Sequence, residues 1–230
     1  MPGQARGMLL VWMDMAPDHQ DDFHAWYNRD HLPERIALPG FRTGRRWQAV
    51  KGAPEFMAAY ELDDPAATAA PEYRERLEHP TAWTRRVMPH FRNTLRGVCA
   101  ITARVGMGSG GFAATLRLAP PAAQREGLRL WLTAEGLPAL MKLSGIVGAL
   151  LVEAVPEGAP RTPTAEQKLR AEPDGNLDWA LLIEGMSALE AEGAAHSLVR
   201  HSAAAQGGAP LQAEQGVYRF LCGVVPPAGP

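Results

Sequence analysis

The chain has 230 residues, of which 46% are hydrophobic and 21% charged, and its formal net charge is −2. This balance gives no electrostatic case for binding nucleic acid or a membrane surface, and no apolar run reaches the ~18 residues of a membrane helix. The two cysteines form no CxxC pair and the N-terminus has no secretory cleavage site, so we expect a cytoplasmic protein without a disulfide framework.

The first half of the chain alternates strand-like apolar runs with helical patterns. The helical stretch 18–38 carries acidic residues near its start, where the helix dipole favours them. Pro80 and Pro89 interrupt a second helical stretch. The predicted order is strand, helix, strand, strand, helix, strand, over residues 8–15, 18–38, 40–50, 54–62, 65–91 and 94–105.

The second half repeats this order. When the sequence is shifted by 105 positions, Trp26 falls on Trp131, Leu32 on Leu137, Pro33 on Pro138 and Gly40 on Gly145. The matching elements are predicted over residues 111–118, 121–142, 145–155, 177–185, 187–205 and 216–225. A unit of this length is too long for a solenoid repeat and indicates a duplicated domain.

The later parts of the two halves align with a shift of 123, which implies about 18 extra residues in the second half. These residues correspond to a Pro-rich and charged stretch at about 156–175, which we interpret as an inserted surface loop. The Gly-rich stretch 106–111 has the composition of a linker. We therefore predict two repeats, residues 1–106 and residues 107–230.

The order of elements in each half is that of the ferredoxin-like βαββαβ unit. Such a unit covers one face of its sheet with helices and leaves the other face bare. Two units can bury these bare faces against each other. We predict an α+β protein in which the two repeats pack sheet to sheet as an intramolecular barrel, with the space between the sheets as the ligand pocket.

One short segment carries a resemblance to a known family. Residues 23–33, FHAWYNRDHLP, combine an aromatic helix with His31 and a Leu-Pro pair, and LPGF follows at 38–41. This pattern resembles the dimeric α+β barrel superfamily and, more narrowly, its EthD-like branch. The resemblance implies a ferredoxin-like barrel with a small-molecule pocket, in a group that includes monooxygenases, isomerases, dehydratases and haem-handling proteins. Gly136 stands at the position of His31 in the second half, so we expect that half to be scaffold.

His31 is the leading candidate for a catalytic residue. It lies eight residues after Phe23 and four after Tyr27, so the three share one helical face. Pro33 disturbs the helix just beyond it. An imidazole titrates near pH ~6.5, which suits proton transfer, although a histidine at a kink can also be purely structural. Tyr27 is the second catalytic candidate, and Phe23 is a candidate for substrate binding.

A second unusual stretch, residues 79–93, is aromatic, basic and broken by proline, and its counterpart in the second half has lost these residues. An arginine here could hold a carboxylate or an enolate, and we name Arg85 for this catalytic role. Trp83, Arg86 and His90 are candidates for substrate binding. The alternative interpretation of the stretch is a solvated basic face.

The sequence gives no motif for a bound metal or cofactor. No HxxxH or HxH spacing occurs, and we predict no metal site. The absence of CxxCH gives no support for attached haem. Cys99 and Cys222 occupy equivalent positions in the two closing strands and are expected to be packing residues. We expect a small-molecule substrate and no cofactor, and the sequence leaves open whether the protein forms a homodimer.

Three functions are compatible with these features. The first is a cofactor-independent enzyme that performs proton-transfer chemistry, such as dehydration, cyclisation, isomerisation or a lyase step, on an aromatic or polyketide-like molecule. The second is a cofactor-free monooxygenase acting on an electron-rich aromatic compound. The third is a binding protein without chemistry, in which His31 supplies only a hydrogen bond.

Overall fold

The computed structural model describes residues 6–155, 162–205 and 211–226. The strands are β1 (Gly7–Met15), β2 (Phe41–Lys51), β3 (Phe56–Leu62), β4 (Phe91–Gly106), β5 (Phe112–Leu118), β6 (Ile146–Ala154), β7 (Gly175–Asn176), β8 (Trp179–Gly185) and β9 (Glu214–Val224). The α-helices are α1 (Gln20–Trp26), α2 (Leu32–Ile36), α3 (Pro71–Glu78), α4 (Ala82–Val87), α5 (Ala122–Trp131), α6 (Leu137–Leu140) and α7 (Ala188–Ala205).

Eight of the described strands close into an antiparallel barrel. Their order around the barrel is β1-β3-β2-β9-β5-β8-β6-β4, and β4 pairs back onto β1. Two seams join the halves of the chain, where β2 pairs with β9 and β4 pairs with β6. Within each half the order is strand, helical segment, strand, strand, helical segment, strand, as the sequence predicts. The fold is therefore α+β with a closed barrel.

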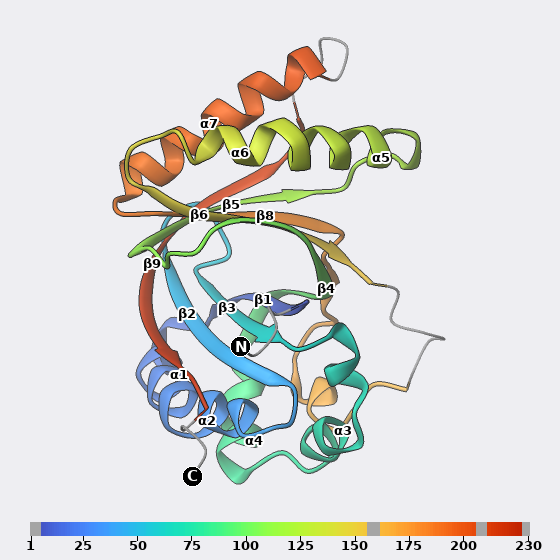
Figure 1. Cartoon of the computed structure of the whole chain (residues 1–230). Coiled ribbons are helices and arrows are strands. Elements are labelled where there is room, and N and C mark those ends of the chain that lie inside the picture. Colours follow the sequence, from blue (N-terminus) through green and yellow to red (C-terminus); the bar gives the residue numbers. More distant parts are fainter. Residues whose placement is uncertain (1–5, 156–161, 206–210, 227–230) are drawn as a thin grey trace.

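Helices cover the outer face of the barrel on two opposite sides (Figure 1). Helices α1 to α4 pack on the strands of the first half, and α5 to α7 pack on those of the second half. Each layer buries its own apolar core between helix and sheet. The core of the first half is markedly aromatic and includes Phe23, Trp26, Tyr27, Phe56 and Phe91.

The interior of the barrel is filled by side chains. Strands from both halves contribute inward-facing residues, and Trp12 and Trp47 are at most 1% exposed. Met8, Met57 and Tyr218 fill the space around them. This corrects the expectation of a ligand pocket between the two sheets, because the described residues pack that space as a core. Large inward residues close it, and packed interiors leave few voids larger than a water molecule.

Pro33 reshapes the helical segment that carries His31. Between α1 and α2, residues Tyr27–His31 form one turn of π-helix, in which the amide of Leu32 bonds the carbonyl of Tyr27. Pro33 has no N–H to continue the α-helical ladder, and its ring crowds the preceding turn. The sequence predicted a disturbance at this point. The second half has an equivalent π-turn at Leu132–Gly136, just before Pro138.

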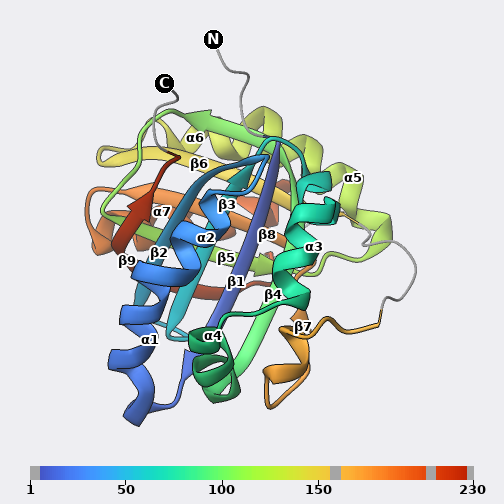
Figure 2. The ribbon, with the colours of Figure 1, turned by 90° about the horizontal axis from the view of Figure 1, so that it is seen from below.

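The described part of the inserted stretch contacts the first half of the chain. It crosses to the first half, where the amide of Glu166 bonds the carbonyl of Leu77 at 2.9 Å and that of Ala165 bonds Glu78 at 3.2 Å. Strand β7 then pairs in parallel with β4, and the two lie side by side in Figure 2. The first six residues of the predicted insertion, 156–161, lie outside the described residues. Within the part of the chain that the structure describes, no helix is long and apolar enough to span a membrane.

Candidate functional site

His31 is buried beneath the helical layer of the first half, with only 7% of its surface exposed. Its ring packs against that of Trp26 at a tilt of 33°, with centroids 4.4 Å apart, and makes an edge contact with the ring of Tyr27 at a centroid distance of 5.1 Å. Its Nδ1 is buried without a hydrogen-bond partner. Burial lowers the pKa of His31 well below its usual value, and the nearby cations Arg35, Arg170 and Arg46 lower it further. His31 is therefore neutral at physiological pH.

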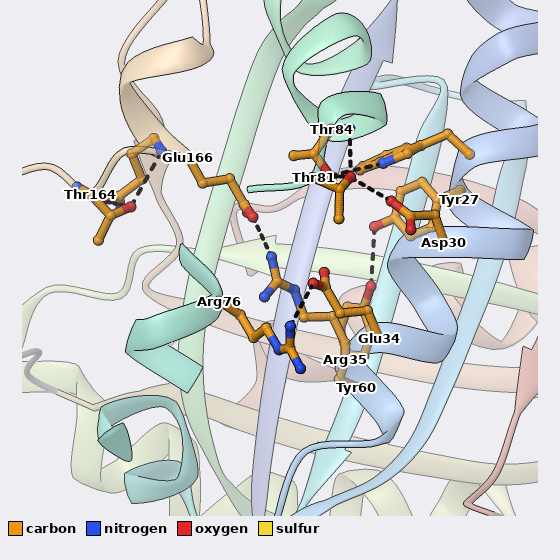
Figure 3. A network of polar contacts seen from close by, with 12 residues as sticks. Tyr27, Asp30, Glu34, Arg35, Tyr60, Arg76, Thr81, Thr84, Thr164 and Glu166 are labelled. Atoms are coloured by element: carbon orange, nitrogen blue, oxygen red, sulfur yellow. Dashed lines mark hydrogen bonds and ion pairs between the residues drawn. The ribbon is translucent and has the colours of Figure 1, made fainter. Parts of the chain in front are cut away.

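Hydrogen bonds from helix α4 hold the His31 segment in place (Figure 3). The Trp26 indole donates to Thr84 Oγ1 at 3.1 Å, and Thr81 donates to Asp30 at 2.8 Å. Thr81 also caps α4 by accepting from the amide of Thr84 at 3.0 Å. One short helix thus fixes the indole against which His31 stacks.

Two buried phenols lie beside the histidine. The hydroxyl of Tyr60 on β3 donates to that of Tyr27 at 3.4 Å, which leaves the Tyr27 proton available to another acceptor. Burial raises the pKa of both tyrosines, so both hydroxyls stay protonated and can donate hydrogen bonds. The guanidinium of Arg46 lies 4.1 Å from the centre of the Tyr27 ring. Arg46 in turn donates to Asn28 at 2.6 Å.

Arg35 lies one helical turn after His31 and is only 2% exposed. Its Nη2 donates to a carboxylate oxygen of Glu166, from the inserted stretch, whereas its Nη1 is buried without a partner. Figure 3 shows the two side chains pointing toward each other from α2 and from the inserted stretch. The guanidinium also lies 5.4 Å from the ring centre of Tyr73. Burial lowers the pKa of Arg35, but Glu166 together with Tyr73, Glu34 and Tyr60 outweighs this effect and raises the pKa above its usual range.

These groups enclose a small cavity of about 40 Å³ between the outer face of the sheet and the helices. Three of its lining residues, Arg96, Gln167 and Arg170, also line an open groove of about 670 Å³. The groove runs along the inserted stretch and β7. The cavity is lined by Leu9, Val11, Tyr27, His31, Arg35, Tyr60, Tyr73, Leu77, Met88, Phe91, Arg96, Glu166, Gln167 and Arg170.

The structure brings only two of the sequence candidates, His31 and Tyr27, to the cavity lining. Phe23 is buried next to Tyr27, with ring centroids 5.4 Å apart, and belongs to the aromatic core. His90 stacks on His19 at 3.4 Å, away from the cavity. These two candidates support the helix without facing the enclosed space.

None of the three candidates on α4 lines the cavity: Trp83 is partly buried against the core, and Arg85 and Arg86 are exposed. Trp83 donates to Asp22 at 2.9 Å, and Arg86 binds the same carboxylate through two nitrogens at 2.8 and 2.9 Å. Arg85 is exposed and donates to the carbonyl of Pro80 at 3.1 Å. This basic stretch forms ion pairs at the surface and does not line the cavity.

Several residues of the site were not identified from the sequence. Arg35 could have been found, because it lies four residues after His31 on one helical face. In the alignment of the two halves, its position is taken by the apolar residue Leu140. Tyr60 and Arg170 carry no comparable signal. Glu166 reaches the site across 131 residues of sequence, a contact that no local pattern indicates.

The second half has no polar side chain at the position that matches His31, where Gly136 stands. Gly136 ends its π-turn, and a Cβ placed there would meet Leu198 of α7 at 3.1 Å and Trp131 at 3.2 Å. Apolar packing therefore takes the space that the imidazole occupies in the first half. Among the described residues, no group of three or more His, Cys, Asp or Glu side chains is arranged to hold a metal ion.

No family model and no curated protein matches the sequence. Solved structures are similar over nearly the whole chain. An anthrone oxidase-like protein has a TM-score of 0.63 at 9% identity, covering 98% of this chain and 95% of its own. A candidate monooxygenase from Fusobacterium nucleatum has a TM-score of 0.58 at 10% identity, covering 97% and 96%. A mutant chlorite dismutase from Candidatus Nitrospira defluvii has a TM-score of 0.57 at 12% identity, covering 96% and 93%.

These likenesses establish the fold as that of the dimeric α+β barrel proteins, as the sequence predicted. Structural similarity at such low sequence identity shows the fold but not the activity, because proteins with one fold have many different functions. The narrower EthD-like relationship stays a prediction. The function has to be argued from the cavity itself.

Proposed function

We propose that this protein is a cofactor-independent enzyme that performs proton-transfer chemistry on a small aromatic or polyketide-like molecule. One observation carries the proposal: a buried, neutral histidine with an unpartnered Nδ1 lines a cavity beside two protonated phenols and a buried guanidinium. A general base needs a lone pair that no hydrogen bond occupies, and the anion it creates needs preorganised donors. The cavity lining contains both.

In the proposed reaction, Nδ1 of His31 takes a proton from a carbon that is next to a carbonyl group of the substrate or is conjugated with it through an aromatic ring. The carbon–hydrogen bond breaks, and its electron pair moves to the carbonyl oxygen to form an enolate. Return of the proton to another carbon gives an isomerase. Its transfer to a departing hydroxyl group, which leaves as water, gives a dehydratase. Burial disfavours an imidazolium, but the enolate formed beside it offsets that cost.

The enolate oxygen would accept hydrogen bonds from Arg35 and Tyr27. Nη1 of Arg35 has no partner, and the proton of Tyr27 is free because Tyr60 donates to its oxygen. The sequence suggested Arg85 for the arginine role. We propose Arg35 instead, since it shares the cavity lining with His31 whereas Arg85 is exposed.

Anthrone is a suitable first probe, because one structural neighbour is described as anthrone oxidase-like and anthrone has an acidic carbon–hydrogen bond next to its aromatic rings. In heavy water, we expect the protein to speed deuterium incorporation at that carbon without consuming oxygen. Nuclear magnetic resonance and an oxygen electrode measure the two quantities. If the protein leaves the exchange rate unchanged, the proposal is overturned for this substrate class.

The same measurement separates the two alternatives. Oxygen consumption during turnover would favour a cofactor-free monooxygenase, which the description of the Fusobacterium nucleatum neighbour supports. Anthrone that binds but is recovered without deuterium would favour a binding protein.

We also infer that the two halves of the chain arose by duplication of one ferredoxin-like unit, with boundaries near residue 106. The matching π-turns before Pro33 and Pro138 support this inference, as do the equivalent left-handed glycines, Gly40 and Gly145, with φ values of 82° and 80°. In this view the second unit closes the barrel and supplies the inserted stretch, and the first unit carries the chemistry.

A further inference from the structure

We propose that the ligand of this site is an aromatic carboxylic acid, and that its carboxylate replaces Glu166 on Arg35. The inference rests on the proposed function in that it uses the same cavity. It concerns the ligand that binds in the cavity, whereas the proposed function concerns the reaction that takes place there. Its physical basis lies in the charge of the lining, the geometry of the Arg35–Glu166 pair, and the size of the cavity.

The charges around the cavity favour an anion. Arg35, Arg96 and Arg170 line it, and Glu166 is the carboxylate among the lining residues. Asp174, which is not part of the lining, forms an ion pair with Arg170. Withdrawal of Glu166 would leave the guanidinium of Arg35, which is 2% exposed, without its carboxylate. A buried charge without compensation is costly, and a ligand with a single negative charge would replace the one that Glu166 takes away.

The Arg35–Glu166 pair shows that this guanidinium holds a carboxylate, but only by one of its two terminal nitrogens. Nη2 donates to Glu166, whereas Nη1 is buried without a partner. A guanidinium binds carboxylates best through two parallel hydrogen bonds. A ligand carboxylate that engaged both nitrogens would satisfy the atom that Glu166 leaves unpaired.

Glu166 is held at this position by a defined local structure. The amide of Thr164 donates to the side-chain oxygen of Gln167 at 3.0 Å, and the amide of Gln167 donates to the Thr164 hydroxyl at 3.3 Å. This reciprocal pair is a capping box at the start of a short helical turn. The turn, Gln167–Leu169, presents Glu166 to Arg35 from the inserted stretch. Glu166 thereby holds the place on Arg35 that we assign to the ligand's carboxylate.

The cavity must enlarge before it can hold a ring. Its volume is about 40 Å³, whereas engineered cavities that bind benzene measure about 150 Å³. Gln167 and Arg170 form the wall between the cavity and the groove of about 670 Å³. Withdrawal of Glu166 with its turn would join the two spaces. The rings of Tyr27, Tyr60 and Tyr73 would then offer faces and edges to an aromatic ligand.

Benzoate and benzamide test this inference, because they match in size and differ in charge. Glu166→Gln removes the competing carboxylate, so we expect it to bind benzoate about tenfold more tightly than the wild type, the effect of one charge-assisted hydrogen bond. Benzamide affinity should not change. Glu34→Gln is the matched control, since Glu34 pairs with Arg76 at 3.9 Å and does not line the cavity. Isothermal titration calorimetry measures each affinity.

A second variant removes the arginine without leaving an unpaired charge. The double variant Arg35→Met with Glu166→Leu should fold, as its melting curve will show, and should lose saturable benzoate binding. Equal benzoate affinity in the wild type and in Glu166→Gln would overturn the proposal, as would a matching gain for benzamide or the absence of benzoate binding to Glu166→Gln.

The outcomes for ligand class and for chemistry are distinguishable. His79→Gln changes an exposed histidine outside the cavity lining and should bind benzoate as the wild type does. If benzoate affinity changes as predicted in the Arg35 and Glu166 variants but the protein does not speed deuterium exchange in anthrone, the carboxylate site stands and the proposed proton-transfer function is wrong. If exchange is observed but benzoate binds equally to the wild type and to Glu166→Gln, the proposed function stands and the proposed ligand class is wrong.

Discussion

His31 and Arg35 lie on successive turns of one helical face, and each keeps one buried nitrogen without a partner. Both positions are apolar or empty in the second half, where Gly136 and Leu140 stand. Comparison of the two halves was therefore enough to select His31 as a candidate from the sequence, and it could have added Arg35. Glu166 escaped this comparison because the inserted stretch has no counterpart in the first half.

Burial of a neutral His31 makes stability depend on pH. The unfolded chain protonates this histidine near pH ~6.5, whereas the folded chain resists protonation until a lower pH. The unfolded state therefore binds more protons as the pH falls below ~6.5, and the free energy of unfolding decreases. We expect a smaller decrease between about pH 7.5 and about pH 5 in His31→Gln than in the wild type, measured by urea unfolding.

His24 and His90 keep part of the pH dependence in that variant, because burial lowers their pKa values as well. His79→Gln is the matched control, since its side chain is 71% exposed. An identical loss of stability in wild type and His31→Gln would contradict the assignment of a neutral buried imidazole.

Removing one residue of the Arg35–Glu166 pair should lower the free energy of unfolding strongly, whereas replacing both with apolar residues should change it little. Their side chains are 2% and 6% exposed, so removing one charge leaves the other buried without compensation. We expect Glu166→Ala to lower the free energy of unfolding by about 3–5 kcal/mol. The double variant Arg35→Met with Glu166→Leu should lie within about 1.5 kcal/mol of the wild type, by analogy with volume-matched apolar replacements. Equal losses in both variants would show that the pair is not coupled.

At the level of elements, the segment that carries His31 depends on its neighbour α4. Thr84, which is 1% exposed, accepts the indole hydrogen bond of Trp26, and Trp26 stacks on His31. The sequence predicted the helical region around α4 and its interruption by proline. It could not show that the buried threonine matters more to the site than Trp83, Arg85 or Arg86, because hydrogen bonding between helices leaves no periodic signal.

Thr84→Val tests this support. Valine fills the same volume but leaves the Trp26 indole N–H buried without an acceptor, so we expect a loss of about 1–3 kcal/mol in stability. Thr102→Val is the control, because the Thr102 hydroxyl makes only a 3.4 Å contact with the carbonyl of Leu151. Urea unfolding measures both variants, and a similar cost for the two would contradict the proposed support.

At the level of the whole molecule, the barrel joins both halves into one core. The sequence predicted the order of elements and the barrel, because hydrophobic patterns and turn residues are local features. It could not predict that the barrel interior is filled. Strand β1 is buried along nearly its whole length, so its pattern does not tell the face inside the barrel from the face beneath the helices.

A shared interior should make unfolding cooperative. Trp12 and Trp47 from the first half pack in one cluster with Leu182 and Tyr218 from the second. We expect a single unfolding transition that coincides by tryptophan fluorescence and by far-ultraviolet circular dichroism. Two separated transitions would show that the halves are stable independently of the shared core.

The central claim is that the cavity beneath α1 and α2 is the site of proton-transfer chemistry and that His31 is its base. The most direct measurement is the rate of deuterium exchange at the acidic carbon of anthrone in wild type, His31→Gln and the control His79→Gln. Removal of a general base typically costs about 100-fold or more in rate, so we predict such a loss in His31→Gln and wild-type exchange in His79→Gln. Wild-type exchange in a folded His31→Gln protein would contradict the claim.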